Sequence, residues 1–125
     1  MNTAVLFIIF NRPDLASVVF EKIREARPKR LYIAADGPRE DRTDEPKKCE
    51  LTRKSILNMI DWDCELKCKF EEQNLGCKIR VSSAIDWFFS LEEEGIILED
   101  DCLPDTTFFR FCEEMLYLYR ANETV

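Results

Sequence analysis

The feature that most constrains the fold of this 125-residue chain is a regular alternation of short apolar runs with amphipathic segments. The apolar runs lie at residues 3–10, 31–35, 64–71 and 95–99, and their composition and spacing are typical of β-strands. Segments with helical periodicity follow each run, at about 13–26, 47–60 and 77–91 and from about 106 onward. This order predicts a three-layer α/β/α fold, with right-handed crossovers, a mainly parallel sheet and helices on both of its faces.

A chain of this length is expected to form one domain, residues 1–125, which buries about two thirds of its unfolded surface. Its hydrophobic content of 46% and charged content of 34% are those of a soluble globular protein. Acidic residues outnumber basic ones by 25 to 18, and the net charge of −7 argues against nucleic acid as a partner. Histidine is absent, which excludes catalytic triads and Cys-His pairs that need an imidazole.

The N-terminal apolar run has the features of a strand rather than of a targeting or membrane segment. Residues 4–10 are too short to cross a bilayer, and Asn11-Arg12-Pro13 follows them where a signal peptide would have small residues. We therefore expect a cytoplasmic protein without a transmembrane segment, whose six cysteines are reduced thiols. Cys64 and Cys68 share the apolar side of the alternating 64–71 strand near a sheet edge, so burial rather than metal binding is expected of them.

Two further segments carry local expectations. Residues 39–46 form the one strongly polar stretch and are predicted to be a solvated, mobile loop. Asp105 or Thr106 is suited to cap the last helix. That helix carries apolar side chains without an obvious partner, which predicts self-association. They are Phe109, Leu116 and Tyr117.

Polar residues follow all four predicted strands, and ligands of open α/β sheets bind at the carboxyl ends of the strands. Asn11 and Arg12 follow the first strand, Asp36 the second, residues 72–76 the third and residues 99–101 the fourth. In a parallel sheet these residues gather along one edge. Ordinary loop polarity explains Asn11, Arg12 and Asn74, each taken alone, equally well.

Three consecutive carboxylates, Glu99, Asp100 and Asp101, follow the fourth strand. Hard divalent cations bind carboxylate oxygens and would relieve the repulsion between these groups. A solvated acidic turn is an equally good explanation of the triplet alone. Neither a dinucleotide-binding glycine motif nor a P-loop is present, so a bound phosphate would need a metal ion to neutralise it.

Four short segments, each at the end of a predicted strand or around it, occur along the chain in the order in which a known family has them. They are Phe10-Asn11-Arg12-Pro13, Ala35-Asp36-Gly37-Pro38, Glu72-Gln73-Asn74-Leu75-Gly76-Cys77 and Gly95-Ile96-Ile97-Leu98-Glu99-Asp100-Asp101-Cys102-Leu103-Pro104. Together they resemble the nucleotide-binding half of GT-A fold glycosyltransferases, in particular bacterial family 2-like nucleotide-diphospho-sugar transferases. The acidic triplet is also similar to that of the N-acetylglucosaminyltransferase I family. The resemblance covers nearly the whole chain.

The resemblance implies a GT-A sheet that stops after the D-x-D metal motif. Asp101 would be the direct ligand of Mn2+ or Mg2+, with Glu99 beside it, and Asp100 would contact the ribose or the metal shell. Asp36 would recognise the base. The residues implied in binding a nucleotide-diphosphate sugar are Phe10, Asn11, Arg12, Asp36, Asn74, Gly76, Arg80 and Asp100.

The implied function is that of a metal-dependent glycosyltransferase domain that transfers a sugar to an unknown acceptor. Members of the family are typically longer, and their second half supplies the acceptor site and the catalytic group. The chain is therefore expected to be a fragment or a donor-binding half, with its catalytic residues unassigned. The alternative is a non-catalytic nucleotide or nucleotide-sugar binding module. A receiver-type signalling domain fits poorly, because its acids would follow the first strand.

Overall fold

The computed structural model describes residues 1–105 and 107–121, which form four strands and four helices in strict alternation. The strands are β1 (Val5–Ile9), β2 (Arg30–Ala35), β3 (Glu65–Phe70) and β4 (Ile96–Glu99). The helices are α1 (Pro13–Ala26), α2 (Glu45–Met59), α3 (Cys77–Phe89) and α4 (Phe108–Ala121). The predicted order of elements is confirmed, with boundaries that differ from the expected ones by a few residues.

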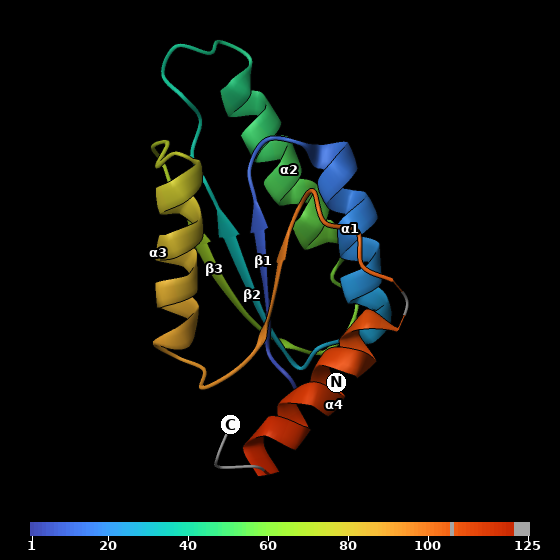
Figure 1. Cartoon of the computed structure of the whole chain (residues 1–125). Helices are drawn as coiled ribbons and strands as arrows, with labels where there is room; N and C mark the ends of the chain where they lie inside the picture. The colour runs from blue at the N-terminus through green and yellow to red at the C-terminus, as the bar shows by residue number, and fades with distance from the viewer. Residues whose placement is uncertain (106, 122–125) are drawn as a thin grey trace.

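The four strands form one sheet in which every neighbouring pair is parallel, in the order β3-β2-β1-β4. Phe7 of β1 lies opposite Ile33 of β2 on one side and Leu98 of β4 on the other. Because all strands run in the same direction, their carboxyl ends lie at one edge of the sheet (Figure 1). The predicted α/β class with a parallel sheet is confirmed.

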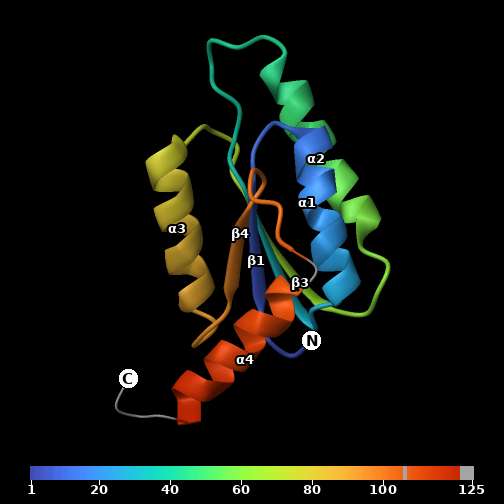
Figure 2. The same ribbon diagram turned by 45° about the vertical axis from the view of Figure 1, so that its right-hand side comes forward.

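Helices cover both faces of the sheet, as expected for a three-layer arrangement. Helices α1 and α2 lie on one face and α3 on the other (Figures 1 and 2). Alternate strand residues serve the two layers: Phe7 packs with Phe20 of α1, whereas Leu6 and Tyr32 pack with Phe88 of α3. Phe7, Phe20 and Phe88 are fully buried, and burial of each such side chain stabilises the fold by about 1.5–3 kcal/mol.

The side of β3 that carries the cysteines is less buried than the sequence predicts. Strand β3 is an edge strand, as predicted, but Cys68 is exposed and Leu66 is 39% exposed. Cys64 and Phe70, near its two ends, contact the core on the face that α1 and α2 cover. The alternation correctly indicates which residues share a side, but the centre of an edge strand is only partly covered by the helices.

Helix α4 lies across the end of the sheet where the strands begin, away from their carboxyl ends (Figures 1 and 2). The expectation that Phe109 lacks a partner is wrong, because its side chain is 5% exposed and belongs to the core. Leu116 is half-buried, and Tyr117 is 66% exposed. The carboxylate of Asp105 accepts a 3.2 Å hydrogen bond from the backbone N–H of residue 107, just before α4, whereas the alternative cap, Thr106, lies outside the described residues.

Within the described residues, no helix combines the length and the apolar character that a membrane span requires. All six cysteines lie in the described part of the chain and are free thiols, of which Cys49 is buried.

Candidate functional site at the carboxyl edge of the sheet

The strand order identifies where a ligand is best accommodated. The chain moves from β1 to β2 to β3 in one direction and then returns to place β4 on the other side of β1. The direction of the crossovers therefore reverses between β1 and β4, and such a reversal point is where open α/β sheets bind ligands. Residues that follow β1 and β4, including Arg12 and Asp100, are expected at this position.

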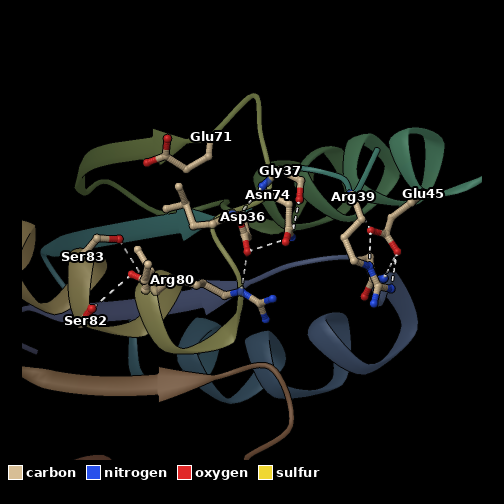
Figure 3. A network of polar contacts seen from close by, with 12 residues as sticks. Asp36, Gly37, Arg39, Glu45, Glu71, Asn74, Arg80, Ser82 and Ser83 are labelled. Atoms are coloured by element: carbon tan, nitrogen blue, oxygen red, sulfur yellow. Dashed lines mark hydrogen bonds and ion pairs between the residues drawn. The ribbon is translucent and has the colours of Figure 1, made fainter. Parts of the chain in front are cut away.

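Asp36, directly after β2, is the centre of a buried polar network (Figure 3). Its residue surface is 1% exposed, and each carboxylate oxygen accepts two hydrogen bonds. The backbone N–H groups of Gly37 and Leu75 donate to Oδ1 at 2.8 and 2.7 Å. The side-chain amide of Asn74 donates to Oδ2 at 3.2 Å, and Nε of Arg80 donates to the same atom at 2.9 Å. Asp36 thus joins the loops that follow β2 and β3.

Arg80 of α3 connects this network to β1. Its side chain is 20% exposed, and its guanidinium carbon lies 4.3 Å from the centre of the Phe10 ring, a cation–π contact. The ion pair with Asp36 fixes the Nε end of the guanidinium, so its two terminal amino groups extend beyond the pair (Figure 3). No hydrogen-bond or ion-pair partner for these two groups occurs among the described residues, so they remain available to a ligand.

The loop after β3 packs tightly against the turn after β2. A Cβ atom at Gly37 would lie 2.6 Å from the backbone carbonyl of Gln73, a distance that real side chains do not reach. The carbonyl of Gly37 also accepts a 3.0 Å hydrogen bond from the Asn74 amide. Gly76, at the start of α3, has φ of +84°, a conformation that favours glycine. The expected residues Asn74 and Gly76 therefore shape this loop.

The side chain of Asn11 bonds to Glu45 and not to the network around Asp36. Its side-chain amide donates to Glu45 Oε2 at 3.1 Å, and Glu45 is 3% exposed. Arg39 donates to the same carboxylate from its backbone N–H, its Nε and one terminal amino group. These bonds, chiefly those from Arg39, lower the pKa of Glu45 to about 2 despite its burial.

The expectation of a solvated loop over 39–46 is therefore wrong at both of its ends. Glu45 and Pro46 belong to α2, and Arg39 is anchored by a buried acid. Between them, Asp41 and Arg42 are exposed, as expected. The sequence signal that could have located Glu45 is an acid followed by proline, a combination suited to the first turn of a helix.

Arg53 of α2 is another residue of this edge that the sequence did not single out. One of its terminal amino groups donates to the backbone carbonyls of Asp36 and Glu71, at 3.1 and 2.7 Å. Its guanidinium carbon lies 4.9 Å from the centre of the Phe70 ring, while its buried Nε has no hydrogen-bond partner among the described residues. Arg53 thus ties α2 to the turns that follow β2 and β3.

The acidic triplet ends β4 beside β1. The backbone N–H of Asp100 donates to the carbonyl of Ile8 at 3.1 Å, which sets the triplet against the end of β1. Burial, together with the neighbouring charge of Asp101, raises the pKa of Asp100, whereas Arg12 and Arg80 act in the opposite direction. Asp101 is exposed. Within residues 1–105 and 107–121, no three cysteine or acidic side chains form a group placed to bind a metal ion.

The structure therefore brings together only part of the predicted site. Phe10, Asp36, Asn74 and Arg80 form one connected network, and Asp100 lies within electrostatic reach of Arg80. Gly76 joins this network through its carbonyl, which accepts a 2.8 Å hydrogen bond from the backbone N–H of Arg80. The side chain of Asn11 bonds to Glu45 instead. Among the described residues, Arg12, Glu99 and Asp101 show no side-chain hydrogen bond to this network.

Comparison of the chain with protein-family models, with curated proteins and with solved structures gives no match. Assignment of a function therefore depends on the geometry and charge of this sheet edge.

Proposed function

We propose that the carboxyl edge of the sheet binds a nucleotide-diphosphate sugar, and that the chain is the donor-binding part of a GT-A type glycosyltransferase. The observation that carries the proposal is the strand order, because it places the loops of β1 and β4 on either side of the reversal point. Phe10, Arg80 and Asp100 all lie at this point, and they come from three different elements.

The balance of charge at this edge favours a divalent metal ion as the bridge to a phosphate. Arg80 and Arg39 are each paired with a buried acid, so their charges are largely compensated. Arg53 binds backbone carbonyls near β2 and β3, so, among the described residues, the uncompensated cation beside the three carboxylates of residues 99–101 is Arg12. A diphosphate would be repelled by this surplus of acids unless a cation lay between them.

The residues fit such an ion through few protein ligands. Mg2+ in nucleotide sites is typically held by one or two carboxylates, together with water and the phosphates of the substrate. Exposed Asp101 would be the direct ligand, and Glu99 or Asp100 would be the second. When bound, the ion would stabilise negative charge on the diphosphate leaving group. Arg80, held in place by Asp36, would orient the nucleotide beside it.

Titration calorimetry with uridine and guanosine diphosphates, with Mn2+ or with EDTA, tests the proposal. We expect Mn2+ to strengthen binding by about tenfold, which is about 1.4 kcal/mol. Asp101→Asn should remove this enhancement, and the matched control Asp86→Asn, an exposed acid on α3, should keep it. Equal affinity with and without Mn2+ in the unchanged chain would contradict the metal site, and no binding of either nucleotide would contradict the proposed function.

The alternative is a non-catalytic nucleotide or nucleotide-sugar binding module. The paired state of Asp36 and Arg80 favours it in one respect, because the network that the structure shows is suited to binding and contains no free general base. A radiolabelled sugar nucleotide distinguishes the two possibilities. Release or transfer of the sugar that Asp101→Asn abolishes would indicate the enzyme, whereas binding without turnover would indicate the module.

A further inference from the structure

Glu45 is a buried acid outside the predicted site, and its bonding pattern needs an explanation. Its side chain is 4% exposed, and it stands at the first residue of α2. Four donors converge on it: the amide of Asn11 at 3.1 Å and, from Arg39, the backbone N–H at 2.8 Å, Nε at 2.9 Å and a terminal amino group at 2.6 Å. The bidentate contact with Arg39 is of the strong, directional kind.

These bonds join three elements at the proposed binding edge. Asn11 follows β1, Arg39 follows β2 and Glu45 begins α2. The guanidinium carbon of Arg39 lies 5.7 Å from the centre of the Phe10 ring, the same ring that Arg80 contacts at 4.3 Å. Two arginines therefore contact Phe10, and each is held by a buried acid, Asp36 for one and Glu45 for the other (Figure 3).

We propose that Glu45 is a positioning residue of the nucleotide site, which acts through Arg39 and Asn11 on the surroundings of Phe10. The inference rests on the proposed function, because it assigns Glu45 a role in that same site. An arginine side chain has a large rotamer entropy, and a ligand that must order it binds more weakly. The Glu45 carboxylate orders Arg39 before the ligand arrives, so that the side of the site formed by the loop after β2 has a fixed conformation.

A purely structural role for Glu45 leads to a different expectation. If Glu45 served only to close the 39–44 loop, its loss would lower the stability of the fold and leave the affinity of folded molecules unchanged. A positioning role instead predicts weaker binding in variants that remain fully folded. Arg39 has a side chain that is 41% exposed, but its removal strands the buried Glu45 carboxylate. Arg39→Lys keeps a cation beside that carboxylate and therefore separates the two roles.

The test compares Glu45→Gln, Arg39→Gln and Arg39→Lys with the control Arg42→Gln. Arg42 belongs to the same loop, but its side chain is 52% exposed, and within residues 1–105 and 107–121 its one ion pair is with Asp41, at 3.7 Å. The probe is uridine diphosphate or guanosine diphosphate, whichever the unchanged chain binds, with Mn2+ and well below the melting temperature. The measurements are Kd by calorimetry, Tm, and the NMR signal of the Arg39 Nε–H group, which persists when that group is held by a carboxylate.

We expect Glu45→Gln and Arg39→Gln to raise Kd about tenfold, Arg39→Lys to have an intermediate effect and Arg42→Gln to have none. The Nε–H signal of Arg39 should disappear in Glu45→Gln. Should Glu45→Gln or Arg39→Gln not fold, Arg39→Lys decides, and an unchanged Kd in that variant would also overturn the positioning role. An unchanged Kd in Arg39→Gln would overturn the positioning role while the proposed function stands. Failure of the unchanged chain to bind either nucleotide would overturn both.

Discussion

Removal of the Asp36 carboxylate should be among the most damaging single changes in this protein, because four donors converge on it in a buried position. In Asp36→Ala the backbone N–H groups of Gly37 and Leu75 lose their acceptor. Each stranded buried donor costs about 1–3 kcal/mol, so these two alone cost about 2–6 kcal/mol. Asn74 keeps its bond to the Gly37 carbonyl, and Arg80 is exposed enough to bind water.

This range agrees with the cost of breaking a buried ion pair by removing one partner, about 3–5 kcal/mol. Asp36→Asn should cost less, about 1–3 kcal/mol, because an amide oxygen at the Oδ1 position still accepts from both backbone groups. Its amino group, however, would face the donors of Asn74 and Arg80. Since small domains are stable by only about 5–15 kcal/mol, the asparagine variant gives a measurable result even if the alanine variant unfolds.

The assay is urea denaturation followed by far-UV circular dichroism, with the slope of the transition compared between variants. Asp41→Ala is the matched control, because its side chain is 80% exposed and its ion pair with Arg42 is long. We expect the control to change the free energy of unfolding by less than about 0.5 kcal/mol. A decrease of less than about 1 kcal/mol in the free energy of unfolding of Asp36→Ala would refute the reasoning, because two buried donors left without an acceptor should cost more than that.

Three further expectations follow from other contacts. Gly37→Ala should destabilise the fold and loosen the loop after β3, measured by thermal unfolding and proteolysis of that loop, because the new Cβ would meet the backbone of Gln73 at 2.6 Å. Asp100→Asn should raise Tm at pH 7, because burial and Asp101 raise the pKa of this acid and make its charged form unfavourable in the folded state. At pH 3 the substitution should leave Tm unchanged, because the carboxyl is then mostly protonated in both the folded and the unfolded chain. Thiol labelling of the native protein should modify exposed Cys77, at the start of α3, rapidly and spare Cys49, which is 2% exposed and whose pKa burial raises.

The ionised form of Glu45 stabilises the fold, whereas the ionised form of Asp100 destabilises it, so the two acids change the stability in opposite directions as the pH falls. The pKa of Glu45 in the folded state is lowered from 4.5 to about 2, so its ionised form stabilises the fold at pH values above 4.5. That contribution is lost as the pH falls from 4.5 toward 2. Acid unfolding of Glu45→Gln should accordingly be less steep in this interval than that of the unchanged chain, and identical profiles would show that the ion pair with Arg39 is weak in solution.

The layers and the direction of the strands could be predicted because their signals are local. A run such as residues 3–10 indicates a buried strand by its own composition, and the alternation with helical segments leads to a parallel sheet. The gathering of Phe10, Asp36 and Asp100 at one edge then follows from the common direction of the strands. The alternation of residues 64–71 also indicates a strand near an edge. What these signals omit is how far the helices cover the centre of that strand, where Cys68 is exposed.

The partners of buried charges could not be predicted, because they depend on residues far apart in the sequence. Asp36 pairs with Arg80, 44 positions later, and Glu45 bonds to Asn11, 34 positions earlier. In a polar stretch such as 39–46, solvation is the expectation for each charge unless a partner is known, because burial of an unpaired charge is very unfavourable. Here the fold supplies the partners, and the resulting pairs leave the acids of residues 99–101 as the surplus charge at this edge. That surplus is the reason why we propose a cation between these acids and a bound diphosphate.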